Sequence, residues 1–442
     1  MLKLKVMFYK TREIYMKLNY KRTVLVGFAF FIITSFWGAY DAIVPKILTN
    51  LFEMKQFTSG IIMSLDNIFA LFMLPLFGGL SDKVKTRFGR RTPFIIVGTL
   101  LSIVFFAWLG YIRSADMLVL FVIVLLMTLI SMAVFRSPAV ALMPDVTVKP
   151  LRSKGNAIIN LMGTAGGIAV LVLGIVFKTG EEGKTDFSLY VLSVGALMAV
   201  GLIIFLAFVR EPLWAAEMQA DTVKYGLDGE VKAETEKRGL TRSELTSLIL
   251  IRASVALWYT GYNAVTSKYS VYAEKVLGVD FNTTLIVAQA AAVVSYIPVG
   301  IISSRIGRKK SILAGVAMLT AAFVVAIFLT DVKSELYMFP IFALAGIGWA
   351  TINVNSFPMA VELASAGDVG KYTGYYYTAS MAAQIITPVL SGLLVDAFDW
   401  WIFFPYAAVF TGLSFVTMLF VKHGDSKPER IGMLESLAGA ED

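Results

Sequence analysis

Twelve apolar stretches of about 20 residues divide this chain, and they constrain its fold more than any other feature. A helix that crosses a bilayer needs about 20 mostly apolar residues. The stretches lie near 23–47, 58–80, 93–112, 117–143, 155–177, 187–209, 246–270, 281–303, 311–330, 336–361, 371–396 and 400–421. We therefore expect an all-α membrane protein with twelve transmembrane helices.

Composition supports a membrane protein and argues against several other classes. Of the 442 residues, 57% are hydrophobic and 16% are charged, whereas a soluble globular chain is about 25% charged. The absence of cysteine excludes disulfides and thiolate metal sites, and His423 is the single histidine. No nucleophile–base set or phosphate loop is evident. We expect no metal, no cofactor and no enzyme activity.

A polar stretch between the sixth and seventh apolar runs divides the chain six plus six. It spans 210–245 and contains "KAETEKRGLTRSEL". The predicted organisation is an N-terminal segment at 1–22, a six-helix half at 23–209, the linker at 210–245, a second six-helix half at 246–421 and a tail at 422–442.

The basic residues gather in short turns and predict the orientation in the membrane. They include Lys83, Lys85, Arg87, Arg90 and Arg91 after the second run, and Arg305, Arg308, Lys309 and Lys310 after the eighth. A net charge of +8 could indicate nucleic acid, but charge confined to turns is typical of cytoplasmic membrane loops. We expect a monomer in the cell membrane, in contact with lipid and not nucleic acid, with both termini cytoplasmic.

The two basic turns are also an internal repeat. "GGLSDKVKTRFGRRTPFIIVGT" follows Pro75 and "GIISSRIGRKKSILAGV" follows Pro298, each between the second and third helices of its half. Two such halves around a central site are typical of secondary transporters. Orientation alone does not explain the acid and glycines within the first turn. We predict a cytoplasmic gate formed by Asp82, Gly89, Arg90, Arg91 and Glu362.

At the first basic turn, G-x-x-S-D-x-x-x-x-x-F-G-R-R-x-P-F resembles the loop 2–3 motif of the major facilitator superfamily. It is most similar to the form in sucrose transporters and glycoside–pentoside–hexuronide symporters. "RSPAVALMPDVTVKPLRSKGNAIINLMG", "GWATINVNSFPM" and "GKYTGYYYTASMAAQIITPVLSG" resemble further helices of that group. The resemblance covers nearly the whole chain. It implies a secondary active transporter that moves a sugar together with a cation by alternating access.

Comparison with this group also suggests the coupling ion. Where sodium-coupled members carry carboxylates, this chain has Ala70, Leu74 and Arg136. Sodium needs several oxygen ligands, and a guanidinium among them would repel it. The group's sucrose transporters also lack those acids and are proton-coupled. Acids inside spans usually face a cavity, so Asp41, Asp66 and Arg136 are the predicted proton-coupling residues.

A sugar site needs aromatic faces and groups that bind hydroxyls. The predicted substrate-binding residues are Trp37, Asp41, Asn156, Asn160, Tyr259, Asn263, Gln289, Asn353, Asn355 and Gln384. For any single Asn or Gln, a packing role between membrane helices is an equal alternative.

The most favoured function is proton-coupled uptake of a sugar or glycoside, with a sucrose- or maltose-like disaccharide preferred. Two alternatives stay open. A drug or metabolite exporter of the same fold predicts a more apolar cavity. A membrane sensor would need a folded soluble domain, for which a linker of about 35 residues is too short.

Overall fold

The computed structural model describes residues 17–112, 114–148, 151–225, 241–330, 332, 334–362 and 369–424. These residues are almost entirely helical, and within them the structure contains no β-strand beyond an isolated bridge between Thr86 and Gly89. Each of the twelve predicted runs overlaps one long helix. The all-α membrane fold predicted from the sequence is therefore confirmed.

Six long helices form the N-terminal half and six form the C-terminal half. The first six are α2 (Tyr20–Lys46), α3 (Gln56–Lys83), α4 (Thr92–Gly110), α5 (Leu118–Val146), α6 (Arg152–Val176) and α7 (Ser188–Phe208). A shorter helix, α8 (Glu211–Lys224), follows in the predicted linker. The second six are α9 (Arg242–Tyr272), α10 (Phe281–Ile306), α11 (Arg308–Ile327), α12 (Glu335–Glu362), α13 (Val369–Phe398) and α14 (Phe403–Leu419).

Short helical turns extend several of these helices. Two are π-helical, η1 (Ile47–Leu51) after α2 and η5 (Ala273–Leu277) after α9. Two are 3-10 turns, η2 (Ala115–Met117) before α5 and η6 (Trp400–Ile402) before α14. The first helix of each half thus ends in the same kind of turn, which supports the internal repeat.

Eleven of the long helices described here are long and apolar enough to cross a membrane. The exception is α9, whose middle carries Trp258, Tyr259, Tyr262 and Asn263. These side chains lower its average hydropathy without breaking the helix. A polar face in an otherwise spanning helix is tolerated only where that face meets protein or a cavity.

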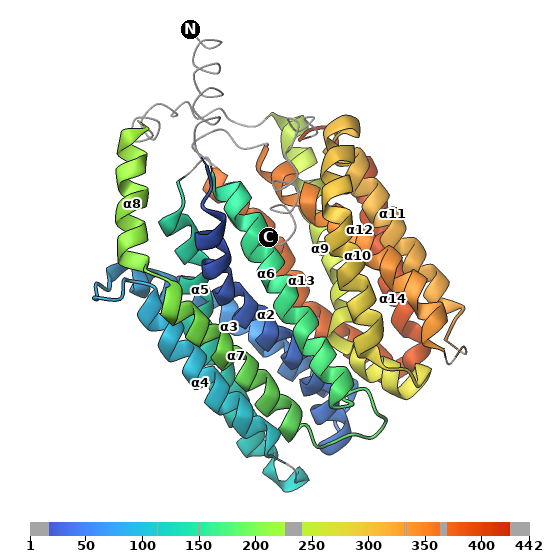
Figure 1. Ribbon diagram of the computed structural model, residues 1–442. Coiled ribbons are helices and arrows are strands. Elements are labelled where there is room, and N and C mark those ends of the chain that lie inside the picture. Colours follow the sequence, from blue (N-terminus) through green and yellow to red (C-terminus); the bar gives the residue numbers. More distant parts are fainter. Residues whose placement is uncertain are drawn as a thin grey trace.

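The two halves lie side by side (Figure 1). In that view α4, α7 and α8 lie on the left, α10, α11 and α14 on the right, and α2, α6 and α13 between them. The most extensive contacts between the halves are made by three pairs of helices: α2 with α9, α3 with α13, and α6 with α10. These pairs surround the centre of the molecule.

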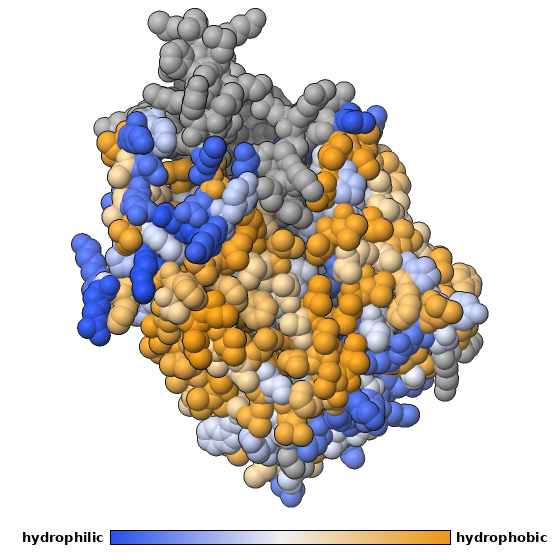
Figure 2. All heavy atoms as spheres, viewed as in Figure 1, coloured by the Kyte–Doolittle hydropathy of each residue, from blue (hydrophilic) through white to orange (hydrophobic). Residues whose placement is uncertain are grey.

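The outer surface is apolar around its middle. Large apolar side chains such as Val104, Val200 and Val409 are exposed there, near the middles of their helices. Figure 2 shows a broad apolar band, with hydrophilic residues gathered toward the two ends of the molecule. This distribution suits a protein surrounded by lipid. We call the end that carries the turn between α3 and α4 the basic end, and the end that carries η1 and η5 the outer end.

Candidate functional site

A cavity of about 560 Å³ lies at the centre of the bundle, between the two halves. Residues from α2, α3, α5 and α6 line one side, and residues from α9, α10, α12 and α13 line the other. Its volume lies within the range of about 300–1,000 Å³ that small-molecule sites occupy.

One wall of the cavity carries opposite charges. Asp41 and Arg136 both line it. The Asp41 side chain is exposed although it lies well inside α2, because it faces the cavity rather than another helix. The guanidinium carbon of Arg136 lies 5.5 Å from the centroid of the Trp37 ring, a cation–π contact. Arg136 thus faces the cavity, as expected, instead of extending to the membrane surface.

Asp66 lies beside this wall on α3. Its Oδ1 accepts hydrogen bonds from the backbone N–H of Asn67 at 2.5 Å and from Asn67 Nδ2 at 2.6 Å. Asn67 itself lines the cavity. Both Asp66 and Asp41 act electrostatically on Arg136. The three predicted proton-coupling residues therefore lie close together, on three different helices.

Six of the ten predicted substrate-binding residues line the cavity. They are Trp37, Asp41, Tyr259, Gln289, Asn353 and Gln384. They come from both halves, which is the arrangement needed if one ligand is to contact both. Ala70, which replaces a carboxylate of the sodium-coupled relatives, lines it too, whereas Leu74 is not among the lining residues described.

The other four predicted residues are not among the cavity-lining residues that the structure describes. Asn156 and Asn160 lie on the cavity face of α6, but one to two turns nearer the basic end than Gly163. Asn355 lies two residues beyond Asn353, so the helix turns it to another side.

One of these four amides, Asn355, makes a contact that fits a packing role. Asn355 Nδ2 donates to the carbonyl of Thr351 within α12, at 2.9 Å, which matches the packing alternative. The buried Nδ2 atoms of Asn160 and Asn263 have no hydrogen-bond partner among the described residues.

Two residues outside the predicted set, Trp349 and Tyr262, complete the wall. Trp349 stacks on Tyr262 with ring centroids 3.6 Å apart, and Tyr259 meets Trp349 edge-on at 5.3 Å. All three line the cavity. The spacing of Tyr259 and Tyr262, three residues apart on one helix face, was the available signal. The wall thus offers aromatic faces beside its polar groups.

Some polar atoms on the wall have no protein partner within the part of the chain that the structure describes. They are Trp37 Nε1, Ser270 Oγ and Asn353 Oδ1. Buried polar atoms are nearly always hydrogen-bonded. These atoms are therefore available to a ligand with several polar groups. Trp37 Nε1 can donate a hydrogen bond, Asn353 Oδ1 can accept one, and Ser270 Oγ can do either.

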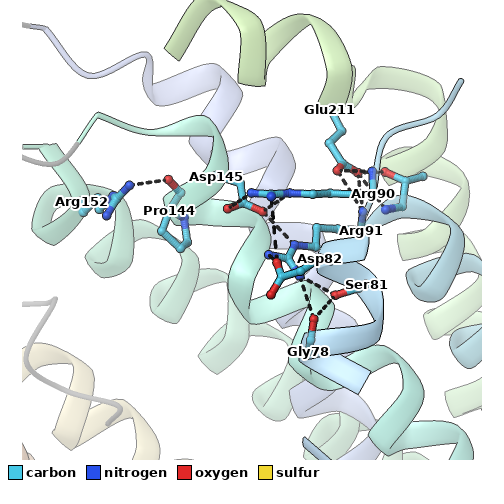
Figure 3. A network of polar contacts seen from close by, with 10 residues as sticks. Gly78, Ser81, Asp82, Arg90, Arg91, Pro144, Asp145, Arg152 and Glu211 are labelled. Carbon is cyan, nitrogen blue, oxygen red and sulfur yellow. Dashed lines mark hydrogen bonds and ion pairs between the residues drawn. The ribbon is translucent and has the colours of Figure 1, made fainter. Parts of the chain in front are cut away.

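The basic turn forms a second polar cluster, away from the cavity (Figure 3). Arg91 is nearly buried and binds Asp82 at 2.5 Å and Asp145 at 2.7 Å. It also donates to Ser81 Oγ and to the Gly78 carbonyl. Arg90 binds Asp145 at 2.6 Å. Asp82 Oδ1 also lies 3.9 Å from Arg90 Nη1, and Asp145 at the end of α5 joins both arginines.

Glu211, at the start of α8, holds the same turn from the other side. Its carboxylate accepts hydrogen bonds from the backbone N–H groups of Arg90, Arg91 and Thr92 at 2.7–2.9 Å, and from Thr92 Oγ1 at 2.7 Å. These groups form the N-terminus of α4, where a negative charge is favourable. Gly89 has a φ of +111°, and a β-carbon there would clash with the Glu211 carboxylate. Glu211 is not among the predicted site residues, because it lies in the polar stretch 210–245 that has the pattern of a linker.

These contacts around the basic turn all lie within the N-terminal half and α8. They brace that half, and the role of Asp82, Gly89, Arg90 and Arg91 as a gate stays a prediction. The side chain of Glu362, the remaining predicted gate residue, lies outside the described residues.

Long apolar helices in two joined halves, with a charged and aromatic cavity between them, define an integral membrane protein built to carry a small molecule. Comparison with known proteins identifies the family. The Major Facilitator Superfamily model matches residues 26–383 and 289–436. The chain therefore belongs to the major facilitator superfamily.

Solved structures of transporters share its fold. A point mutant of the nucleoside transporter NupG is 15% identical with a TM-score of 0.65, and the match covers 90% of this chain and 100% of that one. A point mutant of the peptide transporter POT is 14% identical with a TM-score of 0.67, covering 91% and 93%. A POT family transporter in complex with 5-aminolevulinic acid is 12% identical with a TM-score of 0.68, covering 90% and 95%. No curated protein sequence matches the chain.

Family and fold together identify a secondary transporter and not an enzyme. The expectations of superfamily, fold class and lack of enzymatic function are confirmed. The narrower resemblance to sugar:cation symporters remains a proposal, because identities of 12–15% to these structures indicate only a shared fold.

Proposed function

We propose that this protein is a proton-coupled symporter that takes up a sugar or glycoside by alternating access. The observation that carries the proposal is the placement of Asp41 and Arg136 on the wall of a cavity that also carries aromatic rings and amide side chains. The two halves rock about this cavity, so that it faces each side of the membrane in turn.

Protons, and not sodium ions, drive this transport. Arg136 stands on the cavity wall at a position where the sodium-coupled relatives carry an acid, and Ala70 lines the wall at another. A guanidinium repels a sodium ion from the same space. Asp41 faces the cavity and Asp66 lies close by. A carboxyl in such a place can take up a proton on one side of the membrane and release it on the other.

The substrate class follows from the mixture of groups on the wall. Sugar C–H faces pack on rings such as Trp37 and Tyr259, while Gln289, Gln384 and Asn353 can bind hydroxyls. Trp37 Nε1 and Asn353 Oδ1, which have no hydrogen-bond partner among the described residues, add a donor and an acceptor. A disaccharide of the sucrose or maltose type suits this combination.

The basic turns support an orientation in the cell membrane with the basic end and both termini cytoplasmic. We further propose that the protein acts as a monomer, with one complete cavity in each chain. We also propose the domain boundaries predicted from the sequence, with α8 in the linker at 210–245.

Proton-coupled export of a less polar compound is the second candidate. Part of the wall, including Leu285, Ile341 and Phe342, is apolar, and a substrate with a large apolar group would contact it. The charged wall favours uptake of a polar substrate over this alternative.

Purified protein reconstituted in liposomes tests both candidates. We expect accumulation of one member of a labelled panel of disaccharides, glycosides and pentosides when the outside is acidic, with no effect of sodium at fixed pH and voltage. A nucleoside and a dipeptide belong in the panel because the similar structures are of nucleoside and peptide transporters. Sodium-stimulated uptake contradicts proton coupling. If the proton gradient drives the movement of an apolar compound and of no sugar in the panel, the result supports the exporter.

A further inference from the structure

Two polar contacts join the halves at the outer end, far from the basic turn. The first is an ion pair between Lys46 Nζ and Glu274 Oε2 at 2.6 Å, whose side chains are 0% and 2% exposed. Lys46 is the last residue of α2, and Glu274 lies in η5 after α9. The pair therefore connects the first helix of one half to the first helix of the other.

Each member of this ion pair has further partners. Lys46 Nζ also donates to the carbonyl of Thr179 at 2.6 Å. Glu274 Oε1 accepts hydrogen bonds from Asn50 Nδ2 at 2.9 Å and from the Gly183 N–H at 2.6 Å. A carboxylate of the C-terminal half is thus held by three groups of the N-terminal half. Buried charges are tolerated when they are paired and hydrogen-bonded in this way.

The second contact is a helix cap supplied from the other half. Asp396 of α13 accepts hydrogen bonds from the backbone N–H groups of Gln56 and Phe57 at 2.8 and 2.7 Å, at the start of α3. The residue before α3 provides no side-chain cap of its own. Asp396 is exposed, whereas Lys268 of α9 is buried and donates to the Gln56 carbonyl at 3.0 Å. A carboxylate at a helix N-terminus satisfies free N–H groups and the helix dipole.

We propose that the Lys46–Glu274 ion pair and the Asp396 cap on α3 form an outer latch that holds the outer end shut while the cavity faces the basic end. The inference rests on the alternating access proposed above, but not on the substrate. When the latch opens, water solvates both charges, so each can remain unpaired at little cost in free energy. While the outer end is shut, loss of one partner leaves the other charge buried and unpaired. Removal of one partner therefore favours the outward-open state.

Labelling of a single cysteine tests the latch, since the native chain contains none. The probe is Thr266→Cys, on the cavity wall. A membrane-impermeant maleimide is applied to intact cells and, separately, to inverted membrane vesicles. In Lys46→Met or Glu274→Gln we expect labelling from outside to become about tenfold faster and labelling from inside to become slower. An unfolded variant would label faster from both sides.

The double variant gives the sharper result. Lys46→Met combined with Glu274→Gln removes both charges of the ion pair, so that neither is left buried alone, and its labelling should change less than that of either single variant. Lys178→Met is the matched control, because its ion pair with Glu181 at 3.0 Å lies at the same end but within one half and is exposed. Its labelling should match that of the parent protein.

Asp396→Asn tests the second contact in the same way. Its control is Asp399→Asn, which removes a carboxylate that, among the described residues, accepts a hydrogen bond only from the backbone N–H of the next residue, Trp400. The latch is overturned if Lys46→Met, Glu274→Gln and Asp396→Asn label like their controls from both sides. If the three variants instead label faster from inside and slower from outside, the result would support the latch and overturn the proposed orientation. A protein that shows the contrast but transports no sugar would overturn the substrate proposal alone.

Discussion

At the scale of single residues, the charged wall of the cavity is the feature with the clearest chemical consequence. Asp41 faces the cavity well inside α2, with Arg136 acting on it electrostatically from α5. A carboxyl in this place meets water only when the cavity opens to one side. Its proton can therefore be exchanged with one compartment at a time, which is the requirement for coupling.

We expect Asp41→Asn to keep exchange of substrate across the membrane but to abolish accumulation against a gradient. The amide has nearly the same shape as the carboxyl but cannot take up or release a proton. Counterflow and pH-driven uptake in proteoliposomes separate the two activities. Asp116→Asn, at an exposed acid outside the long helices, is the control. If Asp41→Asn still concentrates substrate, Asp66 becomes the leading proton carrier.

The residues that sequence could identify are those that stand out from an apolar helix. Asp41, Asp66 and Arg136 did so because a charge inside a span is costly and rare. Trp349 and Tyr262 did not, because the chain has 7 tryptophans and 18 tyrosines, and only packing decides which of them face a cavity. The sequence pattern predicts Asn355 together with Asn353, but residues two apart face different sides of a helix, and Asn355 is not among the described residues that line the cavity.

At the scale of elements, α8 acts as a brace rather than as a loose connection. Glu211 at its start binds the N-terminus of α4. Farther along α8, Glu217 pairs with Arg22 at the start of α2, and Trp214 lies 4.9 Å from the same guanidinium. The long helices could be predicted because apolar length alone defines them. The docking of α8 could not, because it depends on long-range contacts with Arg22 and the basic turn.

Gly89→Ala should lower the thermal unfolding midpoint of the purified protein. The backbone at Gly89 has a φ of +111°, and a β-carbon there would clash with Glu211. Backbone strain of this kind costs about 1–3 kcal/mol. Gly79→Ala is the matched control, since a β-carbon at Gly79 meets no described atom within 4 Å. Equal midpoints for the two variants would contradict the close fit of Glu211 into the turn.

At the scale of the whole molecule, the halves touch by backbone as well as by charge. At the outer end α3 and α13 come so close that a β-carbon on Gly60 would clash with the Pro388 carbonyl, and one on Gly392 with the Gln56 carbonyl. These glycines allow the two helices to meet without intervening side chains. The sequence shows the glycines, but not which helix approaches them.

Gly392→Ala should hinder closure of the outer end and slow net transport. Overpacking at a tight contact costs about 1–3 kcal/mol, and a bias of that size shifts a two-state equilibrium about 5- to 150-fold. Gly374→Ala on the same helix is the control, because no described atom lies within 4 Å of its new methyl group. Initial rates of uptake from matched amounts of protein measure the effect. Equal rates would show that this helix contact is not needed for the cycle.

The stacked pair of Trp349 and Tyr262 gives the molecule an optical reporter of its own. The indole lies flat against the phenol at 3.6 Å, on the wall of the cavity. Fluorescence from an indole depends on the groups that touch it and on the water around it. A ligand that enters the cavity therefore changes the emission of Trp349, and comparison with Trp349→Phe separates this signal from that of Trp37, which also lines the cavity. Candidate substrates can thus be screened by titration, without radioactive compounds and before any transport assay exists.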